Sequence, residues 1–361
     1  MNDDICLIAL NSIPEIGPST IRKLISHFGS PTSIFSASLR ELKGVDGVGK
    51  KKAEAIKNFH DIKSVEDEVE RLNVMGIRTV MFYSEDYPEM LKGIHDAPIV
   101  LYIKGEIKKE DRYAIAIVGS RKSTDYGVSV TMSIATELAG MGFTIVSGLA
   151  RGIDTSAHTG AVRCGGRSIA VLGSGIDVPY PPENKGLMER ISQSGFVMSE
   201  FPLGTGPNRE NFPRRNRLIS GLSMGVLVVE AGTDSGALIT ANHALEQGRE
   251  VFSIPGNINS PTSSGTNELI KAGAKVVVSA RDILEELAPV LKGFIKFKEK
   301  VKITLSGEEE TLSKILSGVP THVDDISRQS RMPASKILSV LLSLELKGVV
   351  RQTEGSKFYL A

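Results

Sequence analysis

The sequence contains no tryptophan and only two cysteines, Cys6 and Cys164, among its 361 residues. Two cysteines are too few for a disulfide framework, so we expect the protein to work in the reducing cytoplasm. No stretch approaches the roughly 18 consecutive apolar residues of a membrane-spanning helix, and we expect no membrane partner. The first residues are acidic and lack the apolar segment of a secretory signal, which agrees with that expectation.

Motifs of common catalytic and metal sites are scarce as well. The chain has no His-Glu-x-x-His and no Cys-x-x-Cys, and its six histidines are scattered along the sequence. A metal site is therefore not expected. His158 follows Asp154 by one helical turn, and we interpret it as a hydrogen-bonded structural histidine rather than a general base. We expect no catalytic residue, no hydrolase serine on a strand-to-helix turn, no metal and no cofactor.

Charge of neither sign dominates. The chain has 43 lysines and arginines against 42 aspartates and glutamates, a net charge of +1. This balance neither supports nor excludes a nucleic-acid partner, because only the distribution of charge over the surface matters. With 41% hydrophobic and 24% charged residues, the composition is that of an ordinary globular protein with room for two or three domains.

The most informative stretch spans residues 114–127. Ile115–Val118 reads as a buried parallel strand, and Gly119 then allows a sharp turn that leaves Ser120 and Arg121 at the carboxyl end of the strand. A helical pattern follows. Ligands of open α/β sheets bind at the carboxyl ends of strands, and backbone N–H groups, a hydroxyl and a guanidinium suit a phosphate there.

Strands and helical patterns alternate from residue 114 to about 288, which predicts an α/β domain over residues 75–288 with an extended Rossmann-like, doubly wound parallel sheet. Residues 79–83 and 99–103 read as strands that lead into it. The strands expected within it are residues 114–118, 143–147, 168–172, 225–229, 250–254 and 275–278.

Small and basic residues follow several of these strands. They are Ser147, Gly148, Arg151 and Gly152 after one strand, Lys185 after the next, and Phe212 with Arg214, Arg215, Asn216 and Arg217 ahead of a later one. A dinucleotide such as NAD needs one glycine-rich loop and an acidic residue for its ribose. Several anion-competent loops at one edge of a sheet predict a polymer with many phosphates instead.

Residues 1–65 form a helical module. Gly17 and the segment Gly47-Val48-Gly49 each precede an amphipathic helix, in two segments that resemble helix-hairpin-helix motifs. The second segment is one residue from a Walker A loop, but Lys51 replaces the Ser or Thr that binds Mg²⁺ and no strand precedes it. Two roles stay open for this module: contact with DNA phosphates at helix N-termini, or packing against a partner protein.

Residues 289–305 form a basic linker, read as a strand, a linker or a nucleic-acid arm. Residues 306–361 read as a winged helix, with three helical segments followed by a hairpin around Glu354-Gly355. The expected recognition helix, residues 334–346, is largely apolar and carries one lysine. That composition favours contact with a protein over the reading of a major groove.

Several long motifs in register resemble the DNA processing protein A family (DprA, also called Smf). They are Ile117–Arg121, Ile145–His158, Phe212–Arg217, Ser235–Thr240 and Arg249–Gly256. The resemblance implies a homodimer that binds single-stranded DNA and loads the RecA recombinase in natural transformation and recombination. It also implies that Arg121 is the main DNA-contacting arginine, with the loop around Lys185 and Arg214–Arg217 as further contacts.

The residues expected to contact DNA are therefore Gly119, Ser120, Arg121, Ser147, Gly148, Arg151, Gly152, Lys185, Phe212, Arg214, Arg215, Asn216 and Arg217. The main alternative is a nucleotide-processing enzyme of the phosphoribohydrolase-like Rossmann group, with Glu230 or Asp234 as acid or base. Its Pro-Gly-Gly-x-Gly-Thr loop is missing here, and both acids are better explained as helix caps or rim residues. A scaffold protein without DNA affinity is the third possibility.

Overall fold

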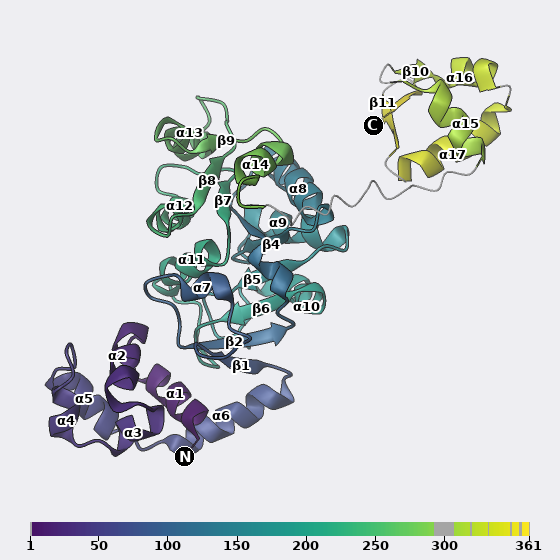
Figure 1. The fold of residues 1–361 in the computed structure, drawn as a ribbon. Helices are drawn as coiled ribbons and strands as arrows, with labels where there is room; N and C mark the ends of the chain where they lie inside the picture. The colour runs from purple at the N-terminus through teal and green to yellow at the C-terminus, as the bar shows by residue number, and fades with distance from the viewer. Residues whose placement is uncertain are drawn as a thin grey trace. The chain divides into compact units, whose positions relative to one another are not determined.

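The computed structural model describes residues 2–291, 307–317, 320–330, 332–346, 349–353 and 356–360. These residues belong to two compact units, Met1–Lys292 and Gly293–Ala361, each described here by itself (Figure 1). The basic linker expected at residues 289–305 lies outside the described residues from residue 292 onward. None of the helices in the described ranges is long and apolar enough to span a membrane.

The first unit is built on a nine-stranded sheet with the strand order β1-β2-β6-β5-β4-β3-β7-β8-β9 (Figure 1). The strands are β1 (Arg78–Met81), β2 (Val100–Gly105), β3 (Ala114–Val118), β4 (Thr144–Ser147), β5 (Ser168–Val171), β6 (Phe196–Ser199), β7 (Gly225–Val228), β8 (Glu250–Ser253) and β9 (Lys275–Val276).

Seven of these strands, β3 to β9, run parallel, which confirms the doubly wound parallel sheet. At one edge β2 pairs antiparallel with β6, and β1 pairs antiparallel with β2. The strand β6 was not predicted.

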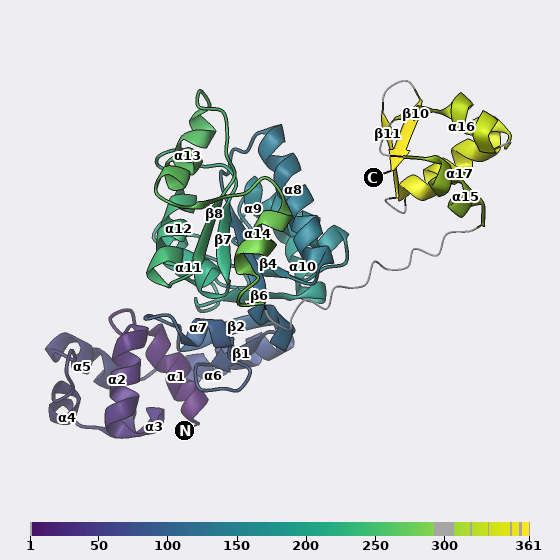
Figure 2. The same cartoon turned by 45° about the horizontal axis from the view of Figure 1, so that its top comes forward.

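Helices cover both faces of the sheet (Figure 2). One layer holds α8 (Asp125–Gly140), α9 (Ile153–Arg163), α10 (Lys185–Ser194) and α14 (Ala280–Leu287), and the other holds α11 (Asn211–Gly221), α12 (Gly236–Glu246) and α13 (Ser264–Lys271). All five residues of β3 are buried, as a strand covered on both faces requires. The chain moves outward from β3 to β6 and then returns to place β7 on the other side of β3, so the topological switch point lies between β3 and β7.

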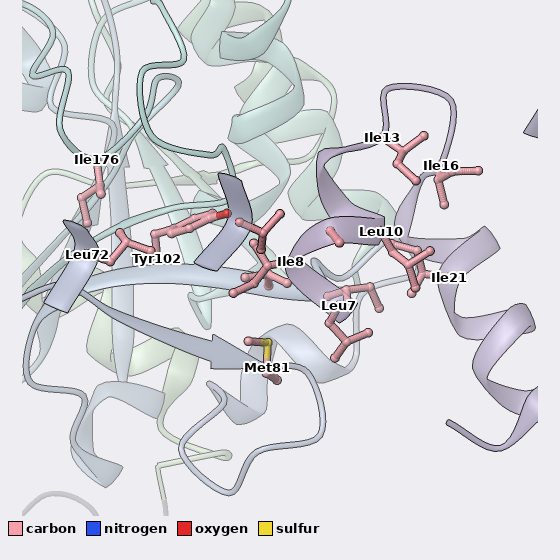
Figure 3. Close-up of a cluster of buried hydrophobic side chains, with 14 of the residues drawn as sticks. Leu7, Ile8, Leu10, Ile13, Ile16, Ile21, Leu72, Met81, Tyr102 and Ile176 are labelled. Atoms are coloured by element: carbon pink, nitrogen blue, oxygen red, sulfur yellow. The ribbon is translucent and has the colours of Figure 1, made fainter. Parts of the chain in front are cut away.

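The helical module at the N-terminus is confirmed and extends past residue 65. It comprises α1 (Asp3–Ser12), α2 (Pro18–Phe28), α3 (Pro31–Ser36), α4 (Leu39–Lys43), α5 (Lys50–Lys57) and α6 (Ile62–Val74). Its apolar side chains share one core with the sheet: Ile8 and Leu72 lie in the same cluster as Tyr102 of β2 and Ile176 (Figure 3). The module therefore belongs to the same compact unit as the sheet.

The second unit has the elements of the predicted winged helix. They are α15 (Gly307–Ile315), β10 (Thr321–His322), α16 (Val323–Ser330), α17 (Ala334–Leu346), β11 (Val350–Thr353) and β12 (Lys357–Leu360). The three strands form a sheet in the order β10-β12-β11, and the unit has a hydrophobic core of its own. Lys336 of α17 is ion-paired with Glu308, so the lysine of the expected recognition helix already has a partner.

Candidate functional site

A cavity of about 1120 Å³ opens at the switch point, where β3 and β7 end. The segments that line it include the turn after β3, the loop after β7, the start of α11, and the short 3₁₀ helix η3 (Pro261–Ser263). Of the residues expected to contact DNA, the cavity is lined by Gly119, Ser120, Arg121, Phe212, Arg215 and Asn216. This edge of the sheet thus contains a cleft that brings together two of the predicted segments, residues 119–121 and 212–216.

The turn after β3 is as tight as its glycine suggested. A Cβ atom on Gly119 would lie 2.7 Å from Cγ1 of Ile153 and 3.0 Å from the carbonyl oxygen of Glu230, so no larger residue fits. The N–H of Ser120 donates to that Glu230 carbonyl at 2.7 Å, and the Ser120 hydroxyl accepts from the N–H of Lys122 at 3.1 Å. The turn is therefore fixed by hydrogen bonds, and Arg121 projects from it with an exposed side chain.

The ring of Phe212 is the centre of a cluster of arginines and aromatic residues. Cζ of Arg121 lies 5.0 Å from the ring centroid and Cζ of Arg215 lies 6.0 Å from it, and the ring of Tyr180 is 5.7 Å away at 43°. Gly173 allows this approach, because a Cβ atom there would come within 2.8 Å of the Phe212 ring. Both predicted arginine segments thus meet at one aromatic side chain.

Three cations at the cavity have no ion-pair partner among the residues that the structure describes: Arg121, Lys122 and Arg209. All three line the cavity and are exposed. The sequence analysis did not single out Lys122 or Arg209. Lys122 follows Arg121 directly in the turn, and Arg209 lies three residues before Phe212, so their positions next to predicted residues were the available signal.

The expectation that Arg215 contacts phosphate directly needs correction. Its side chain is buried, and its guanidinium donates to the carbonyl oxygens of Gly148, at 2.8 Å, and Val171. A Cβ atom on Gly148 would lie 2.6 Å from the guanidinium, so the glycine is what makes room for it. Burial lowers the pKa of Arg215 to about 10. Arg215 joins the ends of β4 and β5 beneath Phe212.

Arg217 is also buried and is held by two carboxylates. It pairs with Glu200 at 2.8 Å and with Asp96 at 2.5 Å, and Glu200 is itself almost fully buried. Arg214 stays half-exposed, 3.4 Å from the same Glu200 and 5.2 Å above the ring of Phe201. Of the three arginines in this run only Arg214 has a guanidinium that solvent reaches freely.

The loop after β4 has already used its N–H groups. The carboxylate of Asp154 accepts from the N–H of Gly148 at 3.1 Å and from that of Ala150 at 3.3 Å, so these groups are not open to a phosphate. The Ser147 hydroxyl is buried and donates to the carbonyl of Ile117 at 2.7 Å. Gly152 has a φ of +75°, and a Cβ atom there would lie 2.3 Å from the Ser120 carbonyl oxygen. This loop braces the Ser120 turn instead of binding an anion itself.

The remaining predicted contacts lie at the rim or in the wall. Arg151 is exposed and pairs with Glu183 at 2.5 Å, next to the cluster of Arg121, Tyr180 and Phe212. Lys185 is exposed at the first position of α10 but does not line the cavity. The Asn216 side chain donates to the carbonyl of Gly236 at 3.2 Å and so ties α11 to α12 along the cavity wall.

Glu230 and His158 have structural roles near the cavity. Both oxygens of the Glu230 carboxylate accept from Thr124, at 2.6 and 2.9 Å, at the start of α8, as the capping interpretation predicted. Asp234 lines the cavity. His158 is buried with its Nδ1 2.7 Å from the Ser168 hydroxyl, which confirms it as a hydrogen-bonded histidine.

One motif escaped the sequence analysis: Gly221-Leu-Ser223-Met-Gly225 has the spacing of a nucleophile elbow. It joins helix α11 to strand β7, which is the reverse of the strand-to-helix turn that the motif requires. The Ser223 hydroxyl is buried and donates to the carbonyl of Ile219 at 2.9 Å. This serine therefore has no access to a substrate.

Comparison with known protein families gives matches along most of the chain. Residues 78–288 match the family described as DNA recombination-mediator protein A. Residues 298–356 match the DprA winged helix domain, and residues 7–59 match a SAM-like helix-hairpin-helix tandem.

Individual relatives agree with these matches. Protein Smf of Synechocystis is 34% identical over an alignment of 390 positions that covers 97% of each chain. The DNA processing protein DprA of Bacillus subtilis is 45% identical, over 59% of this chain and 72% of that protein. The X-ray structure of DprA from Streptococcus pneumoniae superposes with a TM-score of 0.69 at 34% identity, covering 79% of this chain and 98% of that one. A structure of DNA processing protein A from Helicobacter pylori, solved for its single-stranded DNA binding mode, gives a TM-score of 0.54 at 31% identity, covering 59% of this chain and 96% of that one.

Proposed function

This chain belongs to the DNA recombination-mediator protein A family, and we propose that it binds single-stranded DNA in the cavity at the switch point. One observation carries the proposal: Arg121, which has no carboxylate partner in the described chain, lies with its Cζ 5.0 Å from the ring centroid of Phe212. A guanidinium holds phosphate and an aromatic ring offers a stacking surface. A single strand exposes both its phosphates and the faces of its bases to a protein, whereas in a duplex the base faces are covered by stacking.

The direct contacts that we propose are Arg121, Lys122, Arg209 and Phe212, with the backbone of Gly119 and Ser120 beside them. Arg151, Lys185 and Arg214 are exposed near or outside the rim, and we assign them to more distant phosphates of a longer strand. The other predicted residues support the site instead of contacting DNA, because their polar groups bond to other parts of the chain. They are Ser147, Gly148, Gly152, Arg215, Asn216 and Arg217.

We propose that the protein passes the bound strand to the RecA recombinase. This step would serve recombination during DNA uptake and natural transformation, in the cytoplasm. We further propose a homodimer. The edge strand β9 supports it, because Val276 on that strand and Val278 just beyond it are 49% and 76% exposed, and an exposed apolar edge invites pairing with another chain. No catalytic step is proposed; both carboxylate oxygens of Glu230, one of the two acids considered for catalysis, accept hydrogen bonds from Thr124.

The test is a fluorescence-anisotropy titration of the full chain with single-stranded and double-stranded DNA of equal length at two salt concentrations. We expect preference for the single strand and an affinity that falls steeply with salt. Arg121→Ala should weaken single-strand binding by about tenfold and flatten the salt dependence, because one phosphate contact and one stacking contact are lost.

Arg112→Ala is the matched control. Arg112 is also an exposed arginine stacked on an aromatic ring, with Cζ 4.7 Å from the Tyr113 centroid, but it lies before β3 at the opposite end of the same strand. Its loss should leave DNA affinity unchanged. Equal affinities for wild type and Arg121→Ala at both salt concentrations would remove the assignment.

A further inference from the structure

The segment of residues 200–210 connects β6 to α11 and carries Arg209 to the cavity, just ahead of Phe212. It has no helix or strand of its own, so its position depends on the groups that hold it. Arg209 lies near the end of this segment, and Phe212 lies in the first turn of α11 that the segment leads into, so a change in its path affects two of the proposed DNA contacts.

The first unit holds the segment at several points. Glu200, at its start, is paired with the buried Arg217. Further along, the N–H of Gly204 donates to both carboxylate oxygens of Asp177 at 3.0 Å, and the carbonyl of Thr205 accepts from the N–H of Gly175 at 2.8 Å. These anchors all come from the α/β sheet domain.

One anchor comes from elsewhere. The N–H of Leu203 donates to Oε1 of Glu68 at 2.8 Å, and Glu68 belongs to α6 of the N-terminal helical module, 135 residues away in sequence. Glu68 lies one turn before Leu72 on the buried face of that helix, and Leu72 packs in the core with Tyr102 and Ile176 (Figure 3). This shared core holds α6 against the sheet, so the Glu68 carboxylate has a defined position from which to bond the segment.

This contact is costly for the fold. Glu68 is only 9% exposed, and its burial raises the pKa of its carboxyl group, an effect to which the nearby Asp177 adds. A buried carboxylate is tolerated where it is hydrogen-bonded, and an apolar residue in its place would cost the fold less. In return for this cost, the Glu68 carboxylate fixes the position of Leu203.

We propose that Glu68 is a positioning residue for DNA binding: through Leu203 it holds the 200–210 segment so that Arg209 and Phe212 face the cavity. The N-terminal helical module would then contribute to strand binding without touching the strand. This inference rests on the proposed single-strand function, and it extends that function to a part of the chain that the cavity does not include.

The test compares Glu68→Ala with Glu68→Gln in the full chain. The alanine variant loses the acceptor and should bind single-stranded DNA about five- to tenfold more weakly, the equivalent of one ordinary hydrogen bond. The glutamine variant keeps an acceptor oxygen and should bind within about twofold of wild type. Hydrogen exchange at residues 203–212, followed by mass spectrometry without DNA, should rise in the alanine variant alone.

Tyr83→Phe is the matched control, because the Tyr83 hydroxyl donates to Asp4 and also joins the module to the sheet, but away from the segment. Its affinity should equal that of wild type. The inference is overturned if Glu68→Ala keeps wild-type affinity and exchange, or if Tyr83→Phe weakens binding as much. If wild type itself fails to bind single strands, the proposed function is wrong, and the exchange data still decide whether Glu68 holds the segment.

Discussion

The two ends of the parallel strands treat charge in opposite ways. Asp111 precedes β3 and is buried, and Arg167 precedes β5. Two guanidinium nitrogens of Arg167 donate to the Asp111 carboxylate, each at 2.8 Å, so the two charges neutralise each other. After β3, Arg121 and Lys122 have no ion-pair partner in the described part of the chain. Arg209, from the 200–210 segment, lines the same cavity. Arg112 before β3 is exposed as well, but only the cations after β3 line the cavity.

This difference separates scaffold from site. An arginine whose donors are filled by carboxylates or carbonyls contributes to stability, and its removal leaves a buried partner unsatisfied. An exposed arginine without a partner contributes little to the fold and remains open to a ligand. The buried Arg215 and Arg217 follow the first pattern although they lie near the cavity, so proximity alone does not identify a contact.

The largest effect is expected at the amino ends. Arg167→Ala leaves Asp111 buried without its counter-ion, and such a loss costs about 3–5 kcal/mol of unfolding free energy. Urea denaturation should register the loss, while the folded fraction should bind single-stranded DNA with wild-type affinity. Arg281→Ala, which removes an exposed partner of Glu285, is the control and should change stability by less than about 1 kcal/mol. A clear loss of DNA affinity in Arg167→Ala would break the comparison.

A pH effect is expected at His158, midway between the two ends on α9. Burial, with Arg215 nearby, lowers its pKa from 6.5 to about 3, so the folded chain keeps the ring neutral while the unfolded chain takes up a proton. Stability from this group is complete above pH 6.5 and is lost as the pH falls toward 3. By pH 5 the loss reaches about 2 kcal/mol. His158→Gln should lose less stability than wild type between pH 7 and 5 in parallel urea titrations, and identical losses would contradict the assignment.

Phe212→Leu sharpens the comparison at the carboxyl ends. Leucine keeps apolar volume but removes the ring on which Arg121 lies and on which a base could stack, a contact worth about 1–3 kcal/mol per base. We expect single-strand affinity to fall by about tenfold, measured by anisotropy. Tyr113→Leu, which removes the corresponding ring before β3, should leave affinity unchanged. Equal effects of the two substitutions would erase the distinction between the ends.

The smallest effect is a gain. Glu183 pairs with the exposed Arg151 at 2.5 Å and so occupies a cation beside the cavity. Glu183→Gln should free that cation, tighten single-strand binding by about two- to threefold at low salt and steepen the salt dependence by up to about 0.7 in log–log slope. Glu285→Gln, with the same change in charge on α14, is the control. A steeper slope in both variants would point to net charge rather than to Arg151.

The sequence predicted the parts of this site that depend on local pattern. The strand, glycine turn and helix around Arg121 follow from residues that are neighbours in the chain, and so does the winged helix. The burial of Arg215 and Arg217 does not, because their partners at Val171, Gly148 and Asp96 are 44, 67 and 121 residues away. A run of basic residues looks like a surface until such distant partners are known.

The single core that joins Ile8 and Leu72 to Tyr102 has a calorimetric consequence. The helical module cannot melt apart from the sheet without exposing this shared core, so Met1–Lys292 should unfold in one heat-absorption peak. The C-terminal unit has a core of its own and should give a second, smaller peak. A variant that lacks the N-terminal helices would expose the apolar side chains on the β1–β2 face, and these would have to be replaced by polar ones to prevent aggregation.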